Sequence, residues 1–113
     1  MTAMQQQGAA AKAATYVLST TNTAKKNEAL AAIAKILTER QSEWLAANAE
    51  DVAAAKESGM RPAMLDRLTL TPERIAGIVD GVRQVIALPD PIGQVTKMET
   101  RPNGLIIGRR RVP

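Results

Sequence analysis

The sequence has 113 residues, which is room for one small domain and too few for a large multidomain architecture. It contains no Cys and no His, which excludes a disulfide framework, a thiolate metal site, and catalysis by a Cys or His within this chain. The net charge of +4 is a mild basic excess and only weak evidence for a nucleic-acid partner.

The hydrophobic composition predicts a thin core. Hydrophobic residues make up 45% of the chain, but twenty of them are Ala, and there is no Phe. Because Ala buries little area, we expect the fold to depend on contacts that this sequence does not supply. No apolar run approaches the ~20 residues that a membrane span needs, and the start of the chain carries no secretory-signal pattern. We therefore expect a cytoplasmic protein without a membrane partner.

The first predicted helix covers residues 4–18. Ala, Gln, Lys and Leu, which are good helix formers, fill most of this segment. The Ser, Thr and Asn residues at 19–22 predict a turn that ends the helix. Asn22 or Thr23 can then cap the next helix, because a side-chain oxygen of either residue can accept a free backbone N–H.

The next predicted helix has the clearest apolar periodicity in the chain. Hydrophobic residues recur at helical spacing at Leu30, Ile33, Ala34, Leu37, Trp44 and Leu45. Asn48 followed by Asp51 is typical of a new cap, so we expect a break or kink near Asn48. A short helix through Val52 and Ala55 should follow and stop at Gly59, because Gly favours the position after a helix.

Proline marks the start of two further helices. Pro62 at a first-turn position predicts a short helix. Thr71 can be the N-cap of the second one, with Pro72 in its first turn and Glu73 complementing the helix dipole. Its broad apolar stripe consists of Ile75, Ile78, Val79, Val82, Val85 and Ile86. Pro89 ends this helix.

The end of the sequence predicts a β-hairpin. Residues 94–99 and 105–112 alternate with period two, and the turn sequence Arg101–Pro102–Asn103–Gly104 lies between them. No other segment is typical of a strand, and an isolated two-stranded hairpin is marginal in water. We infer that the missing strands lie further along a longer polypeptide, in another subunit, or in both. The alternative is a small helical domain with a solvated hairpin.

Paired carboxylates are the first candidate chemistry, since they can act as general acid and base. The candidates lie on predicted helix surfaces, where acidic residues usually serve as caps or solvated charges. They are Glu39, Glu43, Glu50, Asp51 and Glu57. The structural interpretation is favoured for all of them.

Phosphate binding is the second candidate chemistry. Gly77 and Gly81 are spaced four apart inside a predicted helix and lack the following Lys-Ser or Lys-Thr of a P-loop, so they favour close helix packing. Arg109 and Arg111 should point to one side of a strand and Arg110 to the other, so they form no single patch. Edge protection or ion pairs between subunits is the favoured role of these Arg residues. We expect no nucleic-acid partner.

The segment Met64–Ile75 is distinctive, and its pattern continues through Val79–Val85 and Leu88–Val95. These runs closely resemble the gamma-glutamyl phosphate reductase family, also called glutamate-5-semialdehyde dehydrogenase. Ala47–Val52, the Lys26-Asn27 pair and the final Arg109–Pro113 are similar to that family as well. The resemblance covers nearly the whole chain and is loosest before about residue 23.

The resemblance implies properties that the residues alone do not show. The family has an aldehyde-dehydrogenase-like α/β fold, with a cofactor-binding domain, a catalytic domain that holds a nucleophilic Cys, and a β extension used in oligomerisation. It implies NADPH-dependent reduction of gamma-glutamyl phosphate to glutamate-5-semialdehyde through a Cys thioester, in proline biosynthesis. Family members are several times longer than this chain, and no family catalytic residue maps onto it. We therefore assign no catalytic, cofactor-binding or metal-ligating residue here.

Two regions and two functions are expected from this resemblance. Residues 1–93 should be a helical segment of the cofactor-binding domain, and residues 94–113 a hairpin leading into an oligomerisation region. The favoured function is the N-terminal portion of the reductase, inactive as an isolated fragment and joined to the remainder of the parent polypeptide. The alternative is a stand-alone helical interaction or dimerisation module without catalysis.

Overall fold

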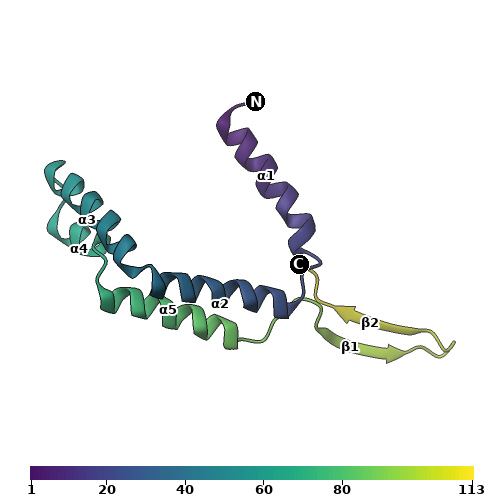
Figure 1. The fold of residues 1–113 in the computed structure, drawn as a ribbon. Helices are drawn as coiled ribbons and strands as arrows, with labels where there is room; N and C mark the ends of the chain where they lie inside the picture. Colours follow the sequence, from purple (N-terminus) through teal and green to yellow (C-terminus); the bar gives the residue numbers. More distant parts are fainter. The chain divides into compact units, whose positions relative to one another are not determined.

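The computed structural model describes residues 1–113, which form five helices followed by two strands (Figure 1). The elements are α1 (Ala3–Leu18), α2 (Thr23–Glu39), α3 (Gln41–Glu57), α4 (Pro62–Leu68), α5 (Pro72–Ala87), β1 (Val95–Thr100) and β2 (Ile106–Arg110). The prediction of a mostly helical chain ending in a hairpin is thus confirmed. Two compact units divide the chain: Met1–Lys26 with Pro89–Pro113, and Asn27–Leu88. None of the five helices combines the length and apolar character needed to cross a bilayer.

Helix α1 is held by local contacts alone. The Thr2 hydroxyl accepts the Gln5 backbone N–H at 3.2 Å, and the Gln5 side chain accepts the Thr2 N–H at 2.8 Å, which completes a capping box. Every residue of this helix is exposed. Its stability therefore comes from the cap and from Ala-rich helix propensity, with no tertiary packing of an apolar face.

The break in the long helical region lies at Arg40, so the prediction of a break near Asn48 was wrong. Arg40 leaves the helical conformation, with φ −105° and ψ 24°, and α3 begins at the next residue. The Arg40 guanidinium pairs with the Glu43 carboxylate and lies 5.6 Å from the centre of the Trp44 ring. A one-residue break leaves the apolar periodicity almost intact, which is why the sequence pattern continues across it.

Asn48 lies inside α3 and bridges to the segment that joins α4 to α5. Its amide nitrogen donates to the Leu68 carbonyl at 2.9 Å, and its amide oxygen accepts the Leu70 N–H at 2.7 Å. The predicted stop at Gly59 is confirmed, because Gly59 has φ +80° and follows the end of α3. The Met60 N–H donates to the Ala55 carbonyl across it, as in a Schellman motif.

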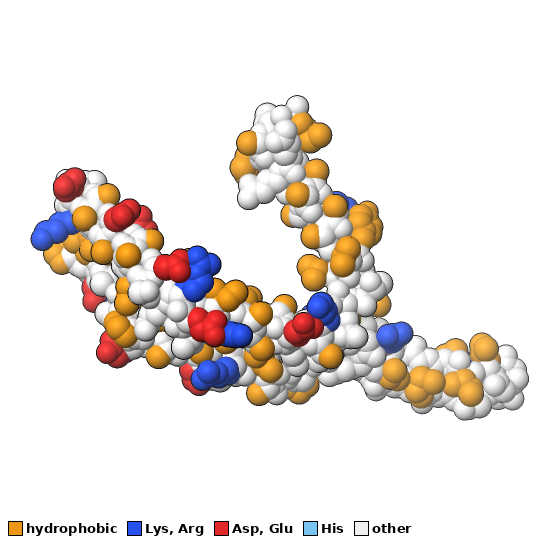
Figure 2. Space-filling model, viewed as in Figure 1, with side chains coloured by type: hydrophobic (Ala, Val, Ile, Leu, Met, Phe, Trp, Pro, Cys, Tyr) orange, Lys and Arg blue, Asp and Glu red, His pale blue; other side chains and the backbone are white.

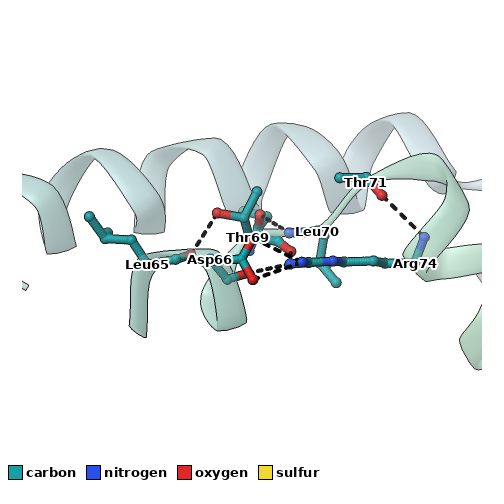
Figure 3. Close-up of polar contacts among 7 residues, drawn as sticks. Leu65, Asp66, Thr69, Leu70, Thr71 and Arg74 are labelled. Carbon is teal, nitrogen blue, oxygen red and sulfur yellow. Dashed lines mark hydrogen bonds and ion pairs between the residues drawn. The ribbon is translucent and has the colours of Figure 1, made fainter. Parts of the chain in front are cut away.

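The turn between α4 and α5 is fastened by Arg74 (Figure 3). Its guanidinium donates to both carboxylate oxygens of Asp66 at 3.0 Å, to the Asp66 carbonyl, and to the Thr69 carbonyl at 2.6 Å. The Thr71 hydroxyl accepts the Arg74 N–H at 3.2 Å, which confirms Thr71 as the predicted N-cap of α5. Arg74 therefore satisfies backbone carbonyls at the end of α4 while it belongs to the first turn of α5.

The core of the Asn27–Leu88 unit is thin, as the composition predicts. Only Ala34, Ile75 and Val79 are buried, and the partly buried Leu37, Trp44, Leu45 and Val82 pack against them. Helices α2 and α5 run side by side around this cluster (Figure 1). The Trp44 indole N–H is buried and has no hydrogen-bond acceptor, which lowers the stability of this unit.

The hairpin is a two-stranded antiparallel sheet, as predicted. Met98 pairs with Gly108 and Thr100 with Ile106, and a bulge between Val95 and Lys97 shifts the register near its open end. Gly104 has φ +84° and donates its N–H to the Arg101 carbonyl at 2.9 Å, which closes the predicted turn. No third strand adds to the sheet.

The two faces of the hairpin differ in character. Met98, Gly108 and Ile106 share one face by the strand register, and Met98 and Ile106 are both more than half exposed. The other face carries Lys97, Glu99, Ile107 and Arg109, where the Glu99 carboxylate receives Lys97 at 2.8 Å. Lys97 and Arg101 beside this carboxylate lower the pKa of Glu99 below its ordinary value. Thr100, the cross-strand partner of Ile106, lies on the same face as Met98. The hairpin thus exposes two large apolar side chains on one face, together with both of its edges.

Candidate functional site

The candidate carboxylates do not come together. Glu39 pairs with Lys35 at 3.9 Å, and Glu43 pairs with Arg40, which lowers the pKa of the Glu43 carboxyl. The other three, Glu50, Asp51 and Glu57, lie exposed on α3. No group of three His, Cys, Asp or Glu residues has a geometry that could hold a metal ion. These residues are surface charges and offer no acid–base pair.

The Gly candidates and the Arg candidates belong to different units of the chain. Gly77 and Gly81 are inside α5, and a Cβ built at either position meets no atom within 4 Å. The Arg110 guanidinium lies over Gly93, with its Nη2 atom 3.2 Å from the place where a Gly93 Cβ would be. Arg109 lines a hollow with Lys97 on a different surface of the hairpin. Arg109 and Arg110 therefore form no joint anion site.

A polar cluster lies where α2 begins, and we call it the Asp90 junction, formed by Asn22, Thr23, Lys26, Asp90 and Ile92. One Asp90 carboxylate oxygen receives the Lys26 ammonium at 2.5 Å and the Thr23 hydroxyl at 2.8 Å. The other receives the Ile92 N–H at 3.0 Å. The Asn22 side chain accepts the Lys25 N–H at 2.8 Å, which confirms the predicted capping by Asn22.

Sequence reasoning missed this cluster because its members are far apart in the chain. Thr23 and Asp90 are separated by 67 residues, and no short motif contains both. The one available signal is that Asp90 stands between Pro89 and Pro91, which hold the loop rigid around it. A carboxylate in a rigid loop next to a helix start has a ready partner in the free N-terminal N–H groups and nearby cations.

The Asp90 carboxyl is the most perturbed acid of the chain. Hydrogen bonds from Lys26, Thr23 and the Ile92 backbone stabilise the ionised form and lower the pKa of Asp90 from 3.8 to about 2. Its side chain is only 15% exposed, which limits competition from water. The junction is thus built around an ionised carboxylate.

Replacing Asp90 with Asn should make the protein less stable at neutral pH, with a thermal midpoint lower by several degrees. Because the folded-state pKa is depressed, the stabilisation by Asp90 is complete above about pH 4 and is lost as the pH falls towards 2. Thermal unfolding from pH 7 to pH 2 should therefore show the two proteins converging in acid. Asp51→Asn, at an exposed position of α3, is the matched control; identical behaviour of the two variants would contradict the role of the junction.

A hollow of about 420 Å³ lies beside the junction, bordered by residues 19–23, Gly93 and Arg110. Its polar side chains are four hydroxyls, the Asn22 amide, the Lys26–Asp90 ion pair and the Arg110 guanidinium. The Lys26 ammonium is already neutralised by Asp90. The Thr23 hydroxyl donates to the Asp90 carboxylate, but the lowered pKa of Asp90 makes this carboxylate a weak general base. The residues present do not fit a nicotinamide dinucleotide, since no glycine-rich loop leads into a helix here. The junction is suited to joining the start of α2 to the loop after α5.

The fold of this chain also occurs within a much longer protein. No protein-family model matches the chain. A crystal structure of gamma-glutamyl phosphate reductase from Thermotoga maritima matches it with a TM-score of 0.82 and 42% sequence identity. The match covers 86% of this chain and 23% of that chain. The matched 86% of this chain therefore has the fold of one segment of that longer protein.

The sequence comparisons find relatives with the same name as that structure. The chain is 53% identical over 110 residues to the gamma-glutamyl phosphate reductases of Moorella thermoacetica and Aeromonas salmonicida, covering 97% of this chain and 26% of each relative. It is 46% identical over 113 residues to that of Lachnospira eligens. The chain is thus homologous to a segment of gamma-glutamyl phosphate reductase, which confirms the resemblance in its sequence, and it spans about a quarter of the length of these relatives.

Proposed function

We propose that this chain is the N-terminal portion of an NADPH-dependent oxidoreductase that reduces gamma-glutamyl phosphate to glutamate-5-semialdehyde in proline biosynthesis. The observation that carries the proposal is the 53% identity over 97% of the chain to two reductases of that name. The absence of Cys and His from the sequence agrees with a chain that supplies structure and leaves chemistry to other parts. The parent protein is proposed to be cytoplasmic.

The proposed role of this segment is to scaffold the enzyme. Residues 1–93 would be a helical part of the cofactor-binding domain, and residues 94–113 would lead into an oligomerisation region. Two features support a scaffold role: the core contains only three buried residues, and the hairpin leaves Met98, Ile106 and both edges uncovered. Unpaired edges favour the addition of strands from further chain or from another subunit. NADPH would be held by residues outside this chain.

The proposal is tested by exchanging the segment between proteins. In the Moorella thermoacetica reductase, the matched 110 residues are replaced by this chain, and NADPH oxidation is measured with gamma-glutamyl phosphate. The exchanged protein should retain activity within about tenfold, which is about 1.4 kcal/mol in the barrier, because the exchanged segment is proposed to hold none of the reacting groups. The same reductase without the segment is the control, and it should be inactive.

Two results would contradict the proposal. An inactive exchanged protein would show that the chain cannot replace the reductase segment. Reductase activity from the 113-residue chain alone would show that catalysis does not need the remaining three quarters of the relatives. A chain that leaves the exchanged protein inactive but forms a stable, folded dimer by itself would favour the stand-alone interaction module.

A further inference from the structure

Helix α5 has two flanks of opposite character. Its core-facing residues are Ile75, Val79 and Val82, and the half-buried Ile86 continues their stripe at helical spacing. Successive residues of a helix are about 100° apart, so the residues just before and just after a core position lie on opposite sides of it. The residues that precede the last three positions of this stripe are Ile78, Gly81 and Val85. The residues that follow them are Asp80, Arg83 and Ala87. One flank is apolar and the other carries the charges.

Helix α2 repeats the pattern on the same side. Its core-facing residues Ala34 and Leu37 are each preceded by an isoleucine, Ile33 or Ile36, and followed by a polar residue, Lys35 or Thr38. The polar residues of both helices border one shared hollow, which contains Lys35, Thr38 and Arg83. The residues that follow the core positions therefore face one side of the pair, and those that precede them face the other. We call the set Ile33, Ile36, Ile78, Gly81 and Val85 the apolar flank.

The apolar flank is open in this chain. Ile33, Ile36, Ile78 and Val85 are 48%, 44%, 47% and 51% exposed. Hydrophobic side chains lie at the surface along α2 and α5 (Figure 2). A helix with apolar residues on two sides is typical of one that packs on two sides. Arg74 precedes the core residue Ile75 and therefore lies on the same side of α5 as the apolar flank. Its guanidinium is already bound to Asp66 and Thr69.

Gly81 leaves an open space in the apolar flank because it has no side chain. It lies between Ile78 and Val85 on the same side of α5, and a Cβ built there meets nothing within 4 Å. Glycine weakens a helix interior, and no element of this chain uses the space it leaves. A backbone can approach α5 closely at this point, with the larger side chains on either side of it.

We infer that an apolar helix or strand from the remainder of the reductase polypeptide packs on the apolar flank. This inference rests on the proposed function. In the Thermotoga maritima structure the same fold accounts for only 23% of the chain, so about three quarters of that chain lies outside it. The flank carries no free charge, which favours an apolar protein element over a nucleic acid or a charged peptide. The element covers the isoleucines and fills the space above Gly81.

The test compares two double variants of the exchanged Moorella thermoacetica protein. Ile78→Gln with Val85→Gln places two amides on the apolar flank. Ala76→Gln with Arg83→Gln places the same side chains on the polar side of the same helix. The flank variant should lose activity on heating at least about tenfold faster than the unvaried exchanged protein, because two buried amides lack partners. The control variant should stay within about twofold of it.

The isolated 113-residue chain gives the second measurement. There the flank is exposed, so Ile78→Gln with Val85→Gln should leave its urea midpoint nearly unchanged. Equal heat inactivation of the flank and control variants in an active exchanged protein would overturn the inference and leave the proposed function intact. An inactive unvaried exchanged protein would overturn both. If the isolated chain sediments as a dimer that the flank variant converts to a monomer, a second copy is the occupant and the inference is wrong.

Discussion

Replacing Ile75 with Ala should cost about 2–4 kcal/mol of unfolding free energy, the usual range for removing a large buried aliphatic side chain. Ile75 is 2% exposed and lies at the centre of the three-residue core, so the cavity left behind has few neighbours that could collapse into it. Because the whole stability of a small domain is only about 5–15 kcal/mol, this single change is expected to leave the Asn27–Leu88 unit marginal.

Urea unfolding followed by Trp44 fluorescence measures this effect, since Trp44 packs against the same cluster and is the only Trp of the chain. The matched control is Ile78→Ala, which removes the same atoms three residues further along α5 from a side chain that is 47% exposed. The control should cost no more than about 1 kcal/mol. Equal losses for the two variants would show that Ile75 does not form the core.

The helix ends could be predicted because their signals are local. Thr71 with Pro72, the Pro62 start and the Gly59 stop each act through a backbone group within a few residues, and all three lie where they were expected. The hairpin was predictable for the same reason, since its turn contains Asn103 and Gly104. A local signal is sufficient wherever the partner that it needs is a neighbour in sequence.

The Asp90 junction and the position of the helix break could not be predicted in this way. Asp90 finds its partner 67 residues away at Thr23, and only the fold brings the two together. The helix break was expected near Asn48 because Asn48 and Asp51 have the composition of a helix cap, whereas Arg40 is not of a capping residue type. The Asn48 amide is instead bound to Leu68 and Leu70, 20 and 22 residues away. Tertiary contacts decide the role of a residue when several partners compete for one side chain.

The apolar flank shows why periodicity alone gives an incomplete picture of a surface. The stripe on α5 correctly contained Ile75 and Val79, which are buried, but also Ile78 and Val85, which are about half exposed. Periodicity reports all apolar residues of a helix, whether they face the core of this chain or something outside it. The prediction of a fold that depends on further contacts came from the Ala-rich composition, and this surplus of exposed apolar residues agrees with it.

Asn48 is the second position where a large effect is expected. Its amide donates to the Leu68 carbonyl and accepts the Leu70 N–H, so it holds the end of α4 and the middle of the segment that leads to α5. Replacing Asn48 with Ala leaves these partly buried backbone groups unsatisfied and should cost about 2 kcal/mol in urea unfolding. Glu50→Ala, at an exposed position on the same helix, should change the stability by less than about 0.5 kcal/mol.

A conservative variant separates the two roles that have been considered for Asn48. If Asn48 capped a helix, Asn48→Asp would be nearly neutral, because Asp and Asn cap about equally well. In the observed bridge, Asp keeps the acceptor for the Leu70 N–H but places a carboxylate oxygen against the Leu68 carbonyl, where a donor is needed. Asn48→Asp should therefore destabilise the chain at neutral pH and recover part of the loss in acid, when the carboxyl is protonated and can donate. If Asn48→Asp leaves the stability at pH 7 unchanged, Asn48 acts as a helix cap and not as the bridge described above.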